Sequence, residues 1–259
     1  MWPVLLAAIL PTLPGLSDRL KADPSGRLAR YVDYPKDAKR GRFVENPNWY
    51  LKGIDFSCVS PWNDASGVFR AGTAISRRHV IGSKHYPLLV GAVVSFVGVT
   101  GAVTRYKVVA TRELPLCDIV VGLLDYELTP DVRPARILPD DFAKTLANGS
   151  RWPVVTFNQH EETLLSELVC SLGRQHCTPL LTNAHATDEV WRRYGGKIVA
   201  GDSGNPAFLL YGDQPVLLYC IQGTGAGVGP QIHRYRSRVQ QAMDELCPGY
   251  RLEPFAFTP

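Results

Sequence analysis

Short apolar runs of strand length recur along most of this chain. Each is rich in Val, Ile, Leu and aromatic residues and is bounded by Gly, Pro, Asp or Asn, the pattern of β-strands separated by turns. Because no long helical pattern separates them, they favour an all-β sandwich or barrel over a parallel α/β sheet. The runs are VGAVVSFVGV, TRYKVVATREL, DIVVGLLD, WPVVTFN, TLLSELVCSL, AFLLY and PVLLYCIQG.

One helix is predicted, near the C-terminal end of the chain. Between Ile232 and Leu246, apolar residues recur at helical spacing and make one stripe, while three arginines and other polar residues face away from it. We therefore expect an amphipathic C-terminal α-helix that packs against the strands.

Charge is concentrated near the N-terminus. The 259-residue chain, 45% hydrophobic, can bury a substantial core in one large all-β domain or two small ones. Residues 17–43 hold eight of the 28 basic and four of the 24 acidic residues, so the remainder has equal numbers of each. We expect a charged arm over residues 18–47, before a folded domain over 48–259. Since the net positive charge belongs to that arm, no nucleic-acid partner is expected.

The first 17 residues, MWPVLLAAILPTLPGLS, resemble a signal peptide cleaved after Ser17, although no Lys or Arg precedes the apolar run. A secreted or periplasmic protein is then expected. The alternative is an amphipathic or buried N-terminal segment, which leaves a cytoplasmic location open. The run is too short, and too broken by proline, for a transmembrane helix, so stable membrane insertion is not expected.

Six cysteines form an even set that an exported protein can pair as disulfides. Cys170 and Cys177 are close enough in sequence to join the two strands of a hairpin. With His176 and His185 the same cysteines suggest a zinc site, but their spacing matches no common ligand pattern. No metal site is therefore predicted.

The segment AGDSGNPAF, residues 200–208, surrounds Ser203 with glycine and proline. A hydroxyl is a weak nucleophile, so a catalytic serine needs a nearby base and an acid that orients that base. His85 follows a strand-like run, and Asp118 directly precedes the apolar run IVVGLL. A carboxylate buried there is costly unless it is paired, and a histidine N–H is a suitable partner.

Three segments carry a family resemblance. GTAISRRHVIGSKHY resembles the segment of chymotrypsin-like (trypsin-like) serine proteases that ends in the catalytic histidine, which falls on His85. DIVVGLLD resembles the segment that begins with the catalytic aspartate, which falls on Asp118. GDSGNP resembles G-D-S-G-G-P and places the nucleophile on Ser203. The order of the three segments also matches, and the resemblance spans residues 51–247.

The resemblance implies an all-β, chymotrypsin-like double β-barrel with a C-terminal α-helix and an active site between the barrels. It implies a serine endopeptidase that acts on polypeptide substrates through an acyl-enzyme intermediate, without a cofactor. The glycines beside Ser203 permit backbone conformations that a Cβ would strain, so the amides of Gly201 and Ser203 are expected to form an oxyanion hole.

Substrate-binding residues also follow from the resemblance. Lys197 stands where the family has the floor of its specificity pocket, and a buried lysine there would favour acidic side chains. The alternative is an exposed lysine in a loop. Gly223, Thr224 and Gly225 match a strand that pairs with the substrate backbone. The surrounding GTGAGVG precedes no clear βαβ unit, so a dinucleotide site is not expected.

The sequence departs from the family in two places. Tyr86 stands where a cysteine usually follows the catalytic histidine, so the disulfide framework must differ. No I-V-G-G segment supplies the new N-terminus that pairs with the aspartate before the nucleophile, which leaves Asp202 without an evident partner.

Several alternatives stay open. Ser203 can be an ordinary turn serine, His79 competes with His85, and Asp125 is the substitute for Asp118. The chain can also be a catalytically inactive binding protein on the same scaffold, or a serine esterase, although the usual G-x-S-x-G turn is absent. The oligomeric state is not predicted.

Overall fold

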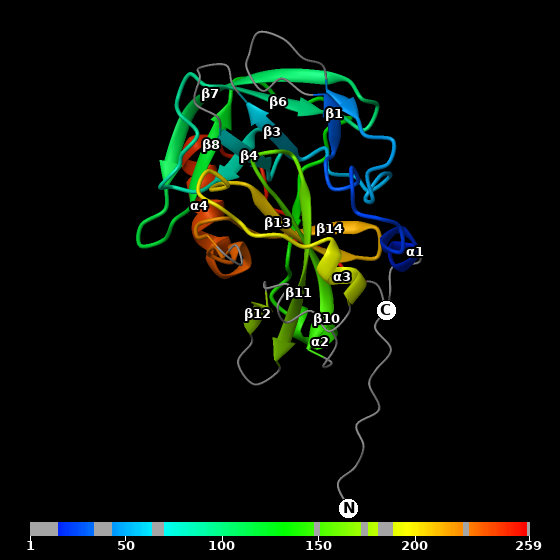
Figure 1. Cartoon of the computed structure of the whole chain (residues 1–259). Helices are drawn as coiled ribbons and strands as arrows, with labels where there is room; N and C mark the ends of the chain where they lie inside the picture. The colour runs from blue at the N-terminus through cyan, green and yellow to red at the C-terminus, as the bar shows by residue number, and fades with distance from the viewer. Residues whose placement is uncertain are drawn as a thin grey trace, which may run out of the picture.

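Most of the apolar runs form two six-stranded sheets in the computed structural model (Figure 1). The structure describes residues 15–33, 43–63, 70–147, 151–171, 176–180, 189–224 and 228–257. It is mostly β-sheet with a helix near the C-terminus, as expected for an all-β chain. Among the described residues, no helix is long and apolar enough to cross a membrane.

The first sheet has the strand order β3-β4-β5-β8-β7-β6, and every pair in it is antiparallel. Its edge strands β3 and β6 lie close together, so the sheet curls into a nearly closed barrel. The strands are β3 (Val59–Asn63), β4 (Arg70–Ala74), β5 (His79–Gly82), β6 (Val93–Val97), β7 (Val103–Glu113) and β8 (Val120–Leu124).

The second sheet has the order β12-β11-β10-β13-β14-β9, with only β9 and β14 parallel among its pairs. Its strands are β9 (Arg136–Ile137), β10 (Arg151–Phe157), β11 (Thr163–Ser171), β12 (His176–Leu180), β13 (Pro206–Tyr211) and β14 (Gln214–Cys220). Short helices α2 (Phe142–Leu146) and α3 (Glu189–Arg193) lie in its connections.

One apolar core joins the two sheets. The ring of Phe56, just before β3, lies 5.2 Å from the Phe157 ring and 5.3 Å from the Phe208 ring, both of which belong to the second sheet. All three side chains are buried in the same cluster. Edge-to-face packing of this kind is favourable beyond the area it buries, so it fixes how the sheets sit against each other.

The predicted C-terminal helix is present, although its first turn differs in type. Residues Ile232–Tyr235 form a 3₁₀ helix, η3, and the α-helix α4 spans Arg236–Leu246. Val239, Ala242 and Met243 are buried, and α4 packs on β7 and β8. This contact explains why β8 is buried along its whole length and reads as a continuous apolar run.

The described residues of the N-terminal segment, which includes the expected charged arm over residues 18–47, pack against the body of the protein. Helix α1 (Leu16–Leu20) buries Leu16 and Leu20 in the main core. Strands β1 (Tyr31–Asp33) and β2 (Val44–Glu45) form a small sheet of their own. Ser17, the expected signal cleavage point, lies within α1, and the first 14 residues lie outside the described part.

The arm's charges are accommodated by backbone oxygens. Arg19 donates to the carbonyls of Tyr50 and Lys52, at 3.3 and 2.7 Å. The buried Tyr194 hydroxyl lies 3.0 Å from the Ala22 carbonyl and 3.2 Å from the Arg19 carbonyl, which share its single proton. Composition alone counts such arginines as solvated charges, but here they anchor the segment to the body.

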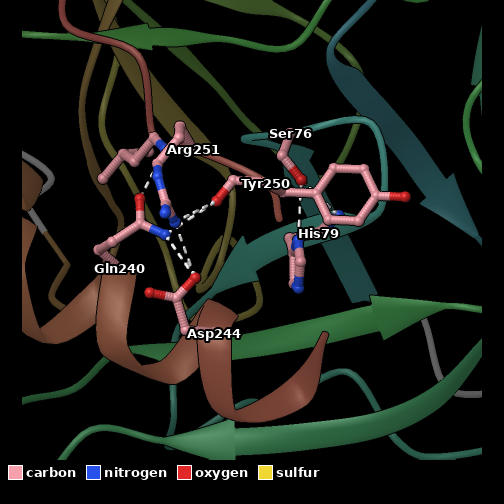
Figure 2. Close-up of polar contacts among 7 residues, drawn as sticks. Ser76, His79, Gln240, Asp244, Tyr250 and Arg251 are labelled. Carbon is pink, nitrogen blue, oxygen red and sulfur yellow. Dashed lines mark hydrogen bonds and ion pairs between the residues drawn. The ribbon is translucent and has the colours of Figure 1, made fainter. Parts of the chain in front are cut away.

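The residues after α4 return across it (Figure 2). Gln240 on α4 donates to the Tyr250 carbonyl at 2.9 Å and accepts from the Leu252 amide at 2.9 Å, while Arg251 pairs with Asp244 at 2.9 Å. The ring of Tyr250 lies 5.5 Å from that of His79, edge to face.

His79 is a buried histidine at the start of β5, with 0% of its surface exposed. Its Nδ1 lies 2.8 Å from the Ser76 hydroxyl (Figure 2). Burial lowers the pKa of His79 to about 4, because the charged imidazolium loses its hydration there. His79 is therefore a neutral core residue.

His79 should make stability depend on pH. Its folded pKa of about 4 lies below the ordinary 6.5, so between these values the unfolded chain binds a proton that the folded chain excludes. This stability is complete above pH 6.5 and is lost as pH falls toward 4, with a slope of up to about 1.4 kcal/mol per pH unit. Urea unfolding from pH 7 to 4 should show a flatter slope for His79→Gln than for wild type. His160→Gln, at an exposed turn, should keep the wild-type slope; equal slopes in all three proteins would contradict the prediction.

Candidate functional site

His85 and Asp118 lie side by side because β5 and β8 are antiparallel neighbours. The last residue pair of their ladder is Gly82 with Val120, so the loop that leaves β5 meets the loop that enters β8. Asp118 Oδ2 lies 2.6 Å from His85 Nδ1, and Asp118 Oδ1 accepts the His85 backbone N–H at 2.7 Å. One carboxylate therefore holds both the backbone and the ring of the histidine.

Ser203 reaches this pair from the second sheet, in the turn that precedes β13. Its Oγ lies 2.8 Å from His85 Nε2. Because the Asp118 carboxylate can only accept, the ring proton belongs on Nδ1, which leaves Nε2 to accept from the serine hydroxyl. The three side chains that sequence reasoning singled out are thus brought together in one hydrogen-bonded chain.

The side chains of the site differ in how far they are exposed to solvent. The His85 side chain is 43% exposed and that of Asp118 only 12%. Ser203 is half-buried, the imidazole is accessible to solvent, and the carboxylate is shielded. A shielded carboxylate interacts more strongly with its histidine than an exposed one would, because less water screens the pair.

Cys220 is a neighbour of this site that sequence reasoning did not assign. The thiol is buried, and burial, helped by the negative charge of Asp118, raises the pKa of Cys220 to about 12. It is therefore a neutral thiol and not a competing nucleophile. In the sequence, only its place in the apolar run PVLLYCIQG indicates that this cysteine is buried.

The competing residues lie elsewhere. His79 is in the core, bonded to Ser76. The Asp125 carboxylate accepts the backbone N–H groups of Lys107 and Tyr126, at 2.9 and 3.1 Å, at the opposite end of β8 from Asp118. Neither side chain is bonded to Ser203 or His85.

The turn around Ser203 depends on glycine. Gly201 has a φ of +102° and Gly204 a φ of +88°, both in the left-handed region that favours glycine. A Cβ on Gly201 would lie 2.9 Å from the side-chain oxygen of Gln159. Any other residue at position 201 would thus be strained by its backbone, and the end of the Gln159 side chain would have to move aside.

The turn leaves two backbone N–H groups without a partner among the described residues. The N–H groups of Asp202, Gly204 and Asn205 donate to the carbonyls of Val199, Ile221 and Asp202. Those of Gly201 and Ser203 donate to no described residue. These are the two amides expected to serve as an oxyanion hole.

Asp202 has partners that the sequence did not reveal. Its carboxylate is 1% exposed and accepts two backbone N–H groups, from Gln159 at 2.9 Å and from Val199 at 2.8 Å. The Gln159 side chain also donates to the Ala200 carbonyl at 3.2 Å. The turn between β10 and β11 thereby holds the Ser203 turn in place through the backbone and side-chain amides of Gln159.

The predicted substrate-binding residues differ in where they lie. Lys197 is exposed, which agrees with the alternative of a loop lysine and not with a buried pocket floor. Gly223 and Thr224 follow β14 beside the Ser203 turn, where the Ile221 and Asn205 backbones pair. The Gly223 N–H donates to the Val228 carbonyl, and Gly225 lies outside the described residues.

The cysteines form no disulfide among those whose side chains are described, namely Cys58, Cys117, Cys220 and Cys247. The strand register sets Cys170 directly opposite Cys177, across β11 and β12. Those two side chains, and the zinc alternative that used them, lie outside the described part of the chain.

Comparison with known proteins assigns this chain to no family. No protein-family profile matches the sequence, and a search of curated proteins found no significant match. The site therefore has to be interpreted from its own geometry.

The Asp202 anchor can be tested by Asp202→Asn. An amide keeps one acceptor but opposes a second donor to a backbone N–H, so we expect a loss of about 1–3 kcal/mol in the free energy of unfolding. Urea denaturation at pH 7 measures it. Asp213→Asn, an exposed change in the β13–β14 turn, serves as the control and should leave stability unchanged. Equal stability of both variants would show that the Asp202 bonds contribute nothing.

Proposed function

We propose that this chain is a serine endopeptidase in which Ser203 is the nucleophile, His85 the general base and Asp118 the orienting acid. The observation that carries the proposal is the continuous hydrogen-bonded chain from Ser203 Oγ through His85 to Asp118, with separations of 2.8 and 2.6 Å. Both lie within the reach required of a nucleophile, its base and the group that orients that base. The hydrogen bond between Ser203 and His85 joins residues that are 118 positions apart in sequence. A serine that only forms a turn does not require such a distant partner.

The geometry supports an acyl-transfer mechanism. As Ser203 Oγ attacks the carbonyl carbon of a peptide bond, His85 Nε2 takes its proton and Asp118 stabilises the imidazolium that forms. The carbonyl oxygen becomes an oxyanion that the N–H groups of Gly201 and Ser203 are free to bind. His85 then protonates the leaving amine, and water, activated by the same imidazole, hydrolyses the acyl-enzyme.

The architecture supports the same proposal at the level of the fold. A nearly closed first barrel contributes His85 and Asp118, and the second sheet contributes Ser203 from the turn before β13. We infer that the second sheet is the other half of a chymotrypsin-like double barrel. The segment after β14, with Gly223 and Thr224, is then the edge along which an extended polypeptide would lie.

The amide partners of Asp202 weigh against an inactive binding protein. The strongest argument for that alternative was an aspartate without a partner in the nucleophile turn. Because Gln159 and Val199 satisfy the carboxylate, the turn keeps its shape without any external group.

Reaction with a fluorophosphonate probe tests the nucleophile. Wild type should be labelled at Ser203 and Ser203→Ala should not, as followed by intact mass spectrometry. Asp118→Asn should label and cleave peptide more slowly by about 10⁴-fold, because Nδ1 then lacks a partner that holds the reactive tautomer. Asp125→Asn is the matched control, since that carboxylate caps the far end of the same strand; it should retain wild-type rates. Labelling that survives Ser203→Ala would reject the assignment, and turnover of esters without peptides would indicate an esterase.

Activation by N-terminal cleavage should be unnecessary. Since backbone amides already satisfy Asp202, a protein that carries an N-terminal fusion should react with the probe as fast as the same protein after the fusion is removed, within about twofold. Time courses of labelling for the two forms measure this. Labelling that begins only after removal of the fusion would show that the Ser203 turn needs a new N-terminus.

A further inference from the structure

Arg30 is a buried cation that forms no ion pair with any described residue. It belongs to the N-terminal segment and is 7% exposed. Its backbone N–H donates to the backbone carbonyl of Glu161, and its backbone carbonyl accepts from the backbone N–H of Asn46. Its Nη1 is buried and has no hydrogen-bond partner. Burying a charge in this way is costly unless a partner of opposite charge compensates it.

Two aromatic rings flank the guanidinium. Its central carbon lies 5.0 Å from the Tyr31 ring centroid and 5.8 Å from that of Trp49. Such rings stabilise a cation through their faces. The N–H donors of a guanidinium, however, project from its edge, within its own plane. Ring contacts therefore leave the donors still requiring an acceptor.

An acidic residue, Glu161, lies in the same region, but its carboxylate does not accept a hydrogen bond from the Arg30 guanidinium. Burial raises the pKa of the Tyr31 hydroxyl, the positive charge of Arg30 opposes that shift, and the negative charge of the buried Glu161 carboxylate adds to it. Among the described residues, no hydrogen bond or ion pair joins Glu161 or any other carboxylate to the Arg30 guanidinium.

Arg30 lines a pocket of about 460 Å³. This volume is within the range of small-molecule sites, roughly 300–1,000 Å³. Apolar surface comes from the aromatic residues Tyr31, Phe43, Trp49 and Phe56. The other charged residues of the lining are two cations, Lys52 and Arg133, and two acids, Glu45 and Asp55. Lys52, Arg133 and Glu45 are exposed, and Arg133 lies 3.4 Å from Asp55.

The geometry points to a binding site for a small organic carboxylate with an apolar or aromatic body, whose carboxylate pairs with the edge of Arg30 while its body packs on the aromatic residues. A guanidinium and a carboxylate match as a two-bond pair, which makes this anion the natural complement. A single buried cation also suits one negative charge better than a multiply charged phosphate. The site is separate from Ser203 and does not depend on the proposed protease activity.

The experiment is calorimetric titration of the full chain with 3-phenylpropionate, and with 3-phenylpropionamide as a ligand of the same shape without the charge. We expect the acid to bind with a Kd of about 1 mM or tighter, and the amide at least about tenfold more weakly. Inorganic phosphate should bind more weakly than the acid. N-acetylphenylalanine, titrated in parallel, distinguishes a free acid from a peptide carboxyl terminus as the preferred source of the same group.

Two variants locate the site. Arg30→Met keeps the length of the side chain without its charge and should weaken binding of the acid at least about tenfold, whereas Lys52→Met, at the exposed edge, should change it by less than about threefold. If Arg30→Met does not fold, the acid and amide on wild type decide the question. No binding of the acid, equal binding of acid and amide, or unchanged binding to a folded Arg30→Met would overturn the inference.

Discussion

The antiparallel pairing of β5 with β8 is the constraint on which the site depends. It sets the exit of one strand against the entrance of the other, so that His85 and Asp118 meet although 33 residues separate them. The third member comes from a different sheet. Its distance to His85 is therefore set by how the two sheets pack, through the cluster in which Phe56 contacts Phe157 and Phe208.

Asp202 shows how a buried charge can organise a turn. A carboxylate that is excluded from water needs donors, and two backbone N–H groups from different parts of the chain supply them. Because Gln159 belongs to the β10–β11 turn, the shape of the Ser203 turn is tied to the second sheet. The same bonds leave the amides of Gly201 and Ser203 unused, as a site that binds a developing negative charge requires.

The N-terminal segment links the folded body to the second site that we infer. Composition separates residues 18–47 as a charged arm, but Leu16 and Leu20 are in the core and Arg19 binds backbone carbonyls. Where this segment crosses the body, it places Arg30 between two aromatic rings at the edge of a pocket. Charge counts could not predict this arrangement, because they do not show which cations are buried.

Local pattern was enough to predict most strands and the amphipathic helix, since periodicity and turn residues act over a few neighbouring positions. The three segments that hold His85, Asp118 and Ser203 were indicated by their resemblance to known protease segments. The meeting of His85, Asp118 and Ser203, the exposure of Lys197, the partners of Asp202 and the burial of Arg30 were decided by tertiary structure. Each depends on residues that are distant in sequence, and on whether water or protein surrounds a charge. The sequence by itself determined which groups are available for chemistry, and packing decided which of them meet.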